Sequence, residues 1–305
     1  MRWDDFRRSD NVEDRTGEGG GGGSGGFPLG GGIKLGGGAL VVVVVASLIF
    51  GVNPLVMIGM IEGGGPVAPS PSQSQPPPGY GPQQNPTPGQ PRPSSVHQDP
   101  ANDHVAAVLG DTEDVWRSVF QTMGARYEPP KLVLFRGTTR PSACGRVSSA
   151  TGPFYCSADR ELYIDSAFFA ELAQRFRAPG DFAQAYVIAH EVGHHVQNLT
   201  GTMQKFDQQM QRLDTRGRNA LSVKLELQAD CYAGVWGYFA QRRNKLDPGD
   251  VEAGLRAAAA VGDDQITKGR VAPESFTHGT AEQRLHWFKA GLESGDMRKC
   301  NTFGG

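Results

Sequence analysis

The sequence lacks any excess of basic charge. Its 305 residues hold 30 Lys and Arg against 32 Asp and Glu, which gives a formal net charge of −2. Nucleic-acid binding usually needs a clear basic excess, so we expect no nucleic-acid partner. The chain also lacks an internal repeat of the kind that builds a solenoid. These absences favour an ordinary globular domain for the last two thirds of the chain.

Cysteine is scarce, and none of the four cysteines forms a C-x-x-C pair with another. A zinc site made of all four is therefore disfavoured. Outside the cytosol an even number of cysteines suggests disulfides, and four allow three pairings. We favour Cys144–Cys156, which closes a short loop, with Cys231–Cys300, which ties the C-terminal tail to a helix. Four free thiols are the alternative.

Glycine and proline are concentrated in the first third of the chain. Fourteen of the 42 Gly lie between Gly17 and Gly38, and twelve of the 21 Pro lie between Pro66 and Pro100. Such biased segments cannot bury enough apolar area to fold and serve as linkers. We divide the chain into a disordered Gly-rich segment (1–32), a transmembrane helix (33–61), a Pro-rich linker (62–100) and a globular domain (101–305).

One long apolar run, Leu35–Ile61, carries no charge over 27 residues. A membrane-spanning helix needs about 20 such residues. A buried core helix is the first alternative, but the flanking linkers give it nothing to pack against. A cleaved signal peptide is the second, but the run is too long for one and no clear cleavage site follows it.

The basic residues on the two sides of this run differ in number. Arg92 alone follows it within forty residues, whereas five precede it: Arg2, Arg7, Arg8, Arg15 and Lys34. The positive-inside rule then predicts a single-pass protein of the cell membrane with a cytoplasmic N-terminus. The domain is expected in the periplasm or outside the cell.

The apolar pattern of the domain is mostly helical. We expect a mainly α fold of the α+β class with a small β-sheet. Strands are predicted at 131–135 and 161–165 and helices at 111–124, 180–200 and 218–244, with further helices opening at Asp247-Pro248 and at the capping box Thr280-x-x-Gln283. The second strand, around Tyr163-Ile164, is a candidate edge strand for binding an extended peptide, although core pairing is equally compatible with it.

The segment that carries chemistry is H-E-x-x-H at His190, Glu191 and His194. Positions four apart lie on one helix face, so both imidazoles can bind one Zn²⁺. Glu191 then lies beside the open metal position, where it can accept a proton from a water molecule. The alternative without a metal is a surface helix with two ordinary histidines, but the surrounding residues are apolar, which argues against an exposed helix. Gly193 keeps the helix slim where another backbone could approach.

A third ligand is expected on the next long helix. The spacing that would supply a third His in metzincins holds Gln197 and Thr200, which excludes that class. Glu226 and Asp230 share a helix face downstream, and Glu226 completes a set of two His and one Glu. Asp230 is predicted to accept the other N–H of a zinc-bound His. The alternative for Glu226 is an exposed helix charge.

Two further histidines belong to this part of the sequence. His195 points roughly 100° away from His194 around a helix, so we interpret it as structural or supporting. His278 precedes the last helix and is a candidate donor to the oxyanion of a tetrahedral intermediate, along with Arg284, Tyr186 and Tyr232. A loop histidine that caps the helix is the alternative for His278.

HEVGHHVQNLTG together with ELQADCYAGVW resembles the bacterial neutral zinc metallopeptidase family, which consists of single-span proteins with an H-E-x-x-H domain. The start MRWDDFRRSDNVEDR and the segment PSACG…GPFYCSADRELYIDSAFF resemble it too. The resemblance implies a zincin-like, gluzincin-like arrangement in which two helices supply His190, His194 and Glu226, with Glu191 as catalytic base. The segment from His278 to Arg284 is similar to the His…Arg segment of membrane-associated gluzincins.

The sequence therefore predicts a membrane-anchored zinc metallopeptidase that acts on peptides or proteins outside the cytoplasmic membrane. A non-enzymatic, membrane-tethered zinc-binding scaffold is one alternative, although a structural site needs no base such as Glu191. A zinc amidase acting on peptidoglycan is the other.

Overall fold

The computed structural model describes residues 1–18 and 100–304. These residues are mainly helical with two small sheets, which confirms the predicted α+β class. The helices are α3 (Pro100–Thr122), α4 (Ala167–Gln174), α5 (Asp181–Leu199), α6 (Thr202–Met210), α7 (Thr215–Arg242), α8 (Asp250–Ala260), α9 (Asp263–Thr267) and α10 (Ala281–Ser294). Short 3₁₀ turns lie at Ser149–Thr151, Pro273–Ser275 and Met297–Lys299.

The larger sheet has four strands in the order β1-β2-β6-β5. They are β1 (Val12–Asp14), β2 (Lys131–Phe135), β6 (Glu161–Asp165) and β5 (Phe154–Cys156). β1, β2 and β6 run parallel, and β5 pairs antiparallel with β6. Of the two alternatives for Tyr163-Ile164, core pairing applies, because β6 pairs with β2 on one side and β5 on the other, and β5 takes the edge position.

A two-stranded sheet lies next to β5 in the chain. β3 (Thr138–Ser142) and β4 (Gly145–Ser148) form an antiparallel hairpin. The disulfide Cys144–Cys156 ties the tip of this hairpin to the end of β5. The second bridge, Cys231–Cys300, ties the C-terminal tail to α7. Both predicted pairings are confirmed.

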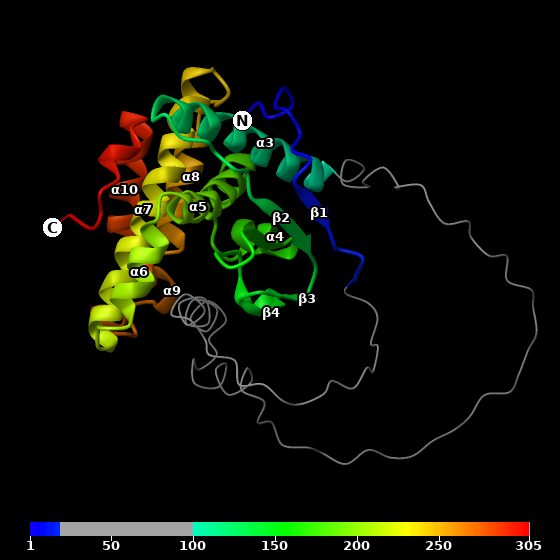
Figure 1. The fold of residues 1–305 in the computed structure, drawn as a ribbon. Helices are drawn as coiled ribbons and strands as arrows, with labels where there is room; N and C mark the ends of the chain where they lie inside the picture. The colour runs from blue at the N-terminus through cyan, green and yellow to red at the C-terminus, as the bar shows by residue number, and fades with distance from the viewer. Residues whose placement is uncertain (19–99, 305) are drawn as a thin grey trace, which may run out of the picture.

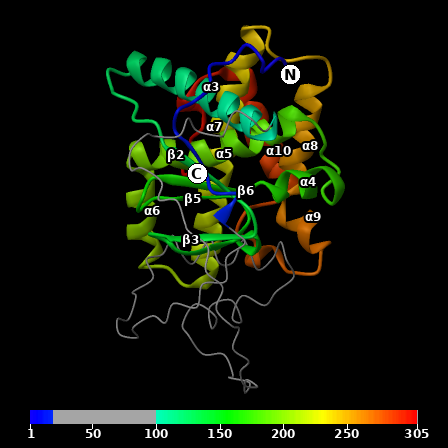
Figure 2. The ribbon, with the colours of Figure 1, turned by 90° about the vertical axis from the view of Figure 1, so that its right-hand side faces the viewer.

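Helix α5 occupies the centre of the domain. It contacts α3, α7, α8 and β5, with α7, α8 and α10 gathered to one side and the sheet to the other (Figures 1 and 2). Its sequence fits this position, since fifteen of the sixteen consecutive residues 182–197 are buried and ten of those fifteen are apolar or glycine. A helix that is apolar nearly all round is stable only when other elements cover it on every side.

Helices α5 and α7 approach each other closely at Gly193. A Cβ at this position would lie 2.9 Å from the carbonyl oxygen of Ala229. The absence of a side chain therefore lets the two backbones come into contact, as the sequence suggested. This contact brings the ligand-bearing turns of α5 and α7 together.

The N-terminal segment differs from its prediction. Residues 1–18 were expected to be disordered with the rest of 1–32, yet they lie on the domain, and β1 extends the large sheet beside β2 (Figure 1). Phe6 and Val12 are buried in this position. The segment is too short to fold alone, but the domain supplies the apolar partner that it lacks. Residues 19–32 lie outside the described residues.

The predicted transmembrane helix at 33–61 and the linker at 62–99 also lie outside the described residues. Among the residues that are described, none of the helices combines the length and apolar character needed to cross a membrane.

Candidate metal centre and active site

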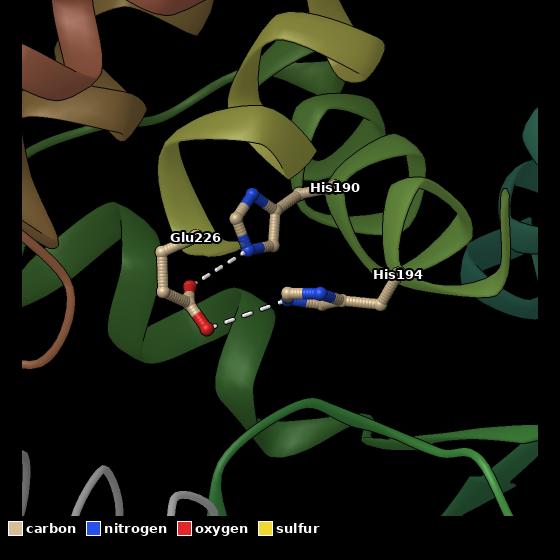
Figure 3. A group of neighbouring side chains, drawn as sticks. All are labelled: His190, His194 and Glu226. Carbon is tan, nitrogen blue, oxygen red and sulfur yellow. Dashed lines mark hydrogen bonds and ion pairs between the residues drawn. The ribbon is translucent and has the colours of Figure 1, made fainter. Parts of the chain in front are cut away.

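Three side chains from two helices converge on one point. His190 and His194 lie four residues apart on α5, and Glu226 faces them from α7 (Figure 3). The carboxylate lies between the rings, with Oε2 3.2 Å from His190 Nε2 and Oε1 3.5 Å from His194 Nε2. One ligand atom from each residue falls within 4.8 Å of the others, and all three residues are buried.

Both imidazoles are held through Nδ1, so that Nε2 of each ring faces Glu226. His190 Nδ1 lies 2.9 Å from Asp230 Oδ1, and His194 Nδ1 lies 2.8 Å from Gln197 Oε1. A ring nitrogen that donates to a carboxylate or amide oxygen carries the proton, so Nε2 keeps its lone pair. The side chain of Gln197 is itself fixed by donating to the carbonyl oxygen of Leu225 at 2.7 Å.

Asp230 is the centre of a buried polar network. Besides His190, it accepts hydrogen bonds from Tyr186 Oη and from Arg284 Nη2, the latter at 2.9 Å. Asp230 is fully buried and Arg284 is 2% exposed. A buried charge of this kind is tolerated only when it is paired and hydrogen-bonded. The network therefore fixes the orientation of His190 from α7 and α10.

Glu191 lies between the two histidines in sequence and faces the same cavity. It is 6% exposed, and its Oε2 has no hydrogen-bond partner among the described residues. A buried carboxylate oxygen without a protein partner is uncommon and suggests a role beyond packing. Its position suits a group that exchanges a proton with a bound reactant.

His278 also lines this cavity, held by a carboxylate behind it. Its Nδ1 lies 2.9 Å from Asp263 Oδ1, and the backbone N–H groups of Thr277, His278 and Gly279 donate to Asp263 Oδ2. Because Nδ1 is engaged by Asp263, Nε2 remains for a reactant. The alternative that His278 caps α10 does not apply, since the capping box is formed by Thr280 and Gln283.

The charges of the site follow from burial and from these pairs. His194 and His190 hold the pKa of Glu226 well below its usual range, although burial opposes this. Burial raises the pKa of Glu191 despite the same two histidines. Glu226 is thus set up as an anionic ligand and Glu191 as a group that can hold a proton nearer to neutrality. Burial lowers the pKa of His278, but Asp263 outweighs it and the net change is upward.

The cavity has a volume of about 270 Å³. The three converging residues, Glu191 and His278 lie in its wall. The rest is largely apolar, with contributions from α4, α5, α6, α7 and β5: Phe168, Val187, Met203, Phe206, Leu225 and Phe154. The site therefore pairs a small polar centre with an apolar surface, the usual character of a ligand pocket.

Other residues singled out in the sequence lie elsewhere. His195 is buried away from the converging group, donating from Nε2 to the carbonyl oxygen of Glu128 at 2.7 Å and accepting from Tyr155 Oη at 3.0 Å. Tyr232 packs against Trp116 and is absent from the cavity wall. Tyr186 and Arg284 reach the cavity but are engaged by Asp230. His278 is the oxyanion candidate with a ring nitrogen left free.

Comparison with known families gives the same picture. Residues 1–303 match the family described as "Putative neutral zinc metallopeptidase". The match covers nearly the whole chain, including the N-terminal segment and both ligand-bearing helices. The chain belongs to this family.

The chain is similar to bacterial proteins over all or about two thirds of its length. The uncharacterized protein YpfJ of Escherichia coli (strain K12) is 46% identical over 311 residues, covering 100% of this chain and 99% of that protein. The uncharacterized protein Rv2575 of Mycobacterium tuberculosis (strain ATCC 25618 / H37Rv) is 42% identical over 213 residues, covering 65% of this chain and 69% of that protein. No solved structure matches the chain.

A zinc metallopeptidase family implies a zinc ion, and the donor set fits one. Two imidazole nitrogens and one carboxylate are the ligands of many catalytic zinc sites, which keep a fourth position open. Both imidazoles present Nε2, and Asp230 and Gln197 supply the supporting hydrogen bonds that such ligands usually have. The unpartnered Oε2 of Glu191 lies in the same cavity wall.

Two supporting residues escaped the sequence reasoning. In the sequence Gln197 served only to exclude the metzincin pattern. Its position three residues after His194 on α5 nevertheless indicates that its side chain can reach that ring. Asp263 lies 15 residues from His278 and carried no local signal. Its role depends on how α9 packs beside the segment before α10.

Proposed function

We propose that this protein is a zinc-dependent peptidase. One observation carries the proposal: an unpartnered buried carboxylate, Glu191, shares a cavity with three converging ligand groups. A structural zinc site has all four positions filled by protein and needs no base. Three ligands with a base beside them favour hydrolysis over a scaffold role.

Each residue has a chemical task in this proposal. His190, His194 and Glu226 would hold the zinc ion, which would supply Lewis-acid activation of a water molecule and of the scissile carbonyl. Glu191 accepts the proton of the attacking water and passes it to the leaving amine. A carboxylate suits both steps, because it can take up a proton and then release it.

His278 is proposed to stabilise the negative charge that develops on the carbonyl oxygen. Its Nε2 is available as a donor, and Asp263 holds the ring in place through Nδ1. A preorganised donor costs no reorganisation when the charge forms, which is why such groups contribute strongly to catalysis.

The substrate is proposed to be a peptide or protein chain in an extended conformation. β5 is the edge strand next to the cavity, and Phe154 and Tyr155 line it. A strand at the end of a sheet can pair with a substrate backbone, and the apolar wall suits a bulky apolar side chain near the scissile bond. We therefore propose that β5, rather than the strand at Tyr163-Ile164, pairs with the substrate backbone.

We propose that the domain works outside the cytosol, anchored to the membrane. The two disulfides support an oxidising compartment. The uncharged, apolar character of the run at 35–61 supports attachment to the membrane. The predicted cytoplasmic N-terminus is not part of this proposal, because β1 pairs with β2 of the domain.

Glu191→Gln tests the proposed function. We expect purified protein to keep its zinc, measured by elemental analysis, because the three ligands are untouched. Hydrolysis of a library of quenched fluorescent peptides should fall by roughly 10²–10⁴-fold, the usual contribution of a general acid–base group.

Glu252→Gln is the matched control, since Glu252 is exposed on α8 and makes the same chemical change away from the cavity. It should hydrolyse the peptides at the parent rate. Equal hydrolysis by parent and Glu191→Gln would refute the peptidase, and parent protein without stoichiometric zinc would refute the metal centre.

A further inference from the structure

The N-terminal segment is built into the domain through its backbone. β1 pairs with β2 in a parallel register that aligns Val12 with Leu132 and Asp14 with Leu134. Upstream of the strand, Ser9 N–H donates to the carbonyl oxygen of Ala106 on α3 at 2.9 Å. The segment therefore bonds to two separate elements of the domain, a strand and a helix.

The domain has a buried charge that depends on this segment. Glu113 on α3 is fully buried. Its carboxylate accepts hydrogen bonds from Ser9 Oγ at 2.5 Å, Asn11 Nδ2 at 2.8 Å and Arg7 Nη2 at 2.6 Å. From the domain itself Arg117 donates at 3.0 Å. Three of these four donors thus belong to residues 7–11, and a buried carboxylate is costly without its partners.

Helix α3 also carries a glycine where the segment crosses it. Gly110 lies in the interior of the helix, and a Cβ there would lie 2.1 Å from the carbonyl oxygen of Arg7. Glycine destabilises a helix interior relative to alanine, so its presence needs a reason. Close passage of the Arg7–Ser9 backbone supplies that reason.

Charged residues of the segment lie opposite residues of the opposite charge on the domain. Arg8 makes two contacts with Asp103 of α3, at 2.9 and 2.6 Å. Glu13 of β1 pairs with Lys131 of β2 at 2.8 Å. Figure 1 shows the segment following α3 to its place beside β2. Charge, shape and strand register all fit this one arrangement.

We propose that residues 1–18 and the domain reside in the same compartment, on one face of the membrane. A single crossing between them would separate the two by a hydrocarbon layer about 30 Å thick, across which β1 and β2 cannot pair. The proposal replaces both the single crossing predicted at 33–61 and the orientation predicted from Lys and Arg, in which the N-terminus and the domain lie on opposite faces. With the domain in an oxidising compartment, the N-terminal segment is there as well.

Cysteine labelling of the full chain in whole cells tests the shared compartment. All four native cysteines are bridged, so one introduced cysteine is the single free thiol. Asp10→Cys reports on the segment and Arg126→Cys on the domain, and both positions are exposed. Each variant is treated with a membrane-impermeant maleimide before and after lysis, after the outer envelope has been permeabilised where one exists.

We expect both variants to be labelled before lysis. Labelling of both only after lysis still supports the shared compartment, while it contradicts the external location given under Proposed function. Labelling of one variant before lysis and of the other only afterwards overturns the inference.

Thermal unfolding of the purified full chain tests the docking itself. Gly110→Ala should lower Tm by several degrees if the segment crosses α3 at this point, because the methyl group displaces it. In a helix with nothing against it, the same change raises Tm. A raised Tm therefore overturns the inference.

A charge exchange gives a second, independent reading of docking. Arg8→Asp should lower Tm because it sets two acidic groups against each other. Adding Asp103→Arg should restore much of the loss, because the pair is rebuilt with its signs reversed. An unchanged Tm in Arg8→Asp overturns docking at this site, and so does a double variant that recovers none of the loss.

Discussion

Asp230 is the residue on which the geometry of the centre depends most. It is not one of the three proposed zinc ligands, yet it orients His190 and pairs with Arg284, and both partners of this pair are buried. Arg284 and His190 hold the pKa of Asp230 below its usual value, although burial opposes this. The carboxylate is therefore charged, which strengthens its hydrogen bond to the ring and raises the basicity of Nε2.

Asp230→Asn should weaken zinc binding by about 10–100-fold, the usual effect of removing the group that supports a ligand histidine. Chelator competition measures the affinity, at a temperature where circular dichroism shows both proteins folded. Asp207→Asn is the control, since Asp207 lines the same cavity but makes no contact with His190. Equal affinities for parent and Asp230→Asn would contradict the assigned role.

At the scale of elements, the site depends on how α7 is held against its neighbours. Gly193 lets α5 touch α7, and Gly291 lets α10 approach it so closely that a Cβ there would lie 1.9 Å from the carbonyl oxygen of Cys231. The bridge Cys231–Cys300 fastens the C-terminal tail to the same helix. Glu226 and Asp230 both lie on α7, so these contacts set the position of the third ligand.

Removing this bridge should cost more stability than removing the other one. Cys231–Cys300 closes a loop of 69 residues and Cys144–Cys156 one of 12. In the chain-entropy model these loops are worth about 4 and about 3 kcal/mol. Urea unfolding of Cys231→Ala/Cys300→Ala and of Cys144→Ala/Cys156→Ala gives the two losses. A larger loss for the shorter loop would contradict this ranking.

At the scale of the whole molecule, the buried His104, which packs against Trp3 of the N-terminal segment, makes the stability of the fold depend on pH. It lies on α3, 4% exposed, with the ring of Trp3 against it at a centroid distance of 5.2 Å. Burial lowers the pKa of His104 to about 4, with Asp181 opposing. Neither ring nitrogen has a hydrogen-bond partner among the described residues. The folded protein therefore keeps this imidazole neutral.

Acid should destabilise the protein through this group. The folded-state pKa lies below the unfolded value of about 6.5, so the unfolded chain takes up the proton first. The stability is fully present above pH 6.5 and is lost as the pH falls towards 4, by about 3 kcal/mol in all. In urea titrations between pH 4 and 7, His104→Phe should lose less stability than the parent. Identical slopes would show that His104 contributes nothing.

Local patterns were sufficient to predict many elements. The strands at 131–135 and 161–165 match β2 and β6, and the helix at 180–200 matches α5 within one residue at each end. Asp247-Pro248 predicted the start of α8 less accurately, because the helix begins at Asp250, after Gly249 in a left-handed conformation. The helix predicted at 111–124 begins earlier, at Pro100, and its first turns are buried against the N-terminal segment and α5, which lie far from them in the sequence.

The amino-acid sequence by itself determined the spacing that puts His190 and His194 on one helix face, with Glu191 between them, because helical periodicity is a local property. It also indicated Glu226 and Asp230, since their spacing obeys the same rule. Tertiary structure alone decided that Asp263 supports His278, that β5 forms the sheet edge and that residues 1–18 complete the domain. These features join segments far apart in the chain, and such contacts depend on packing rather than on local sequence.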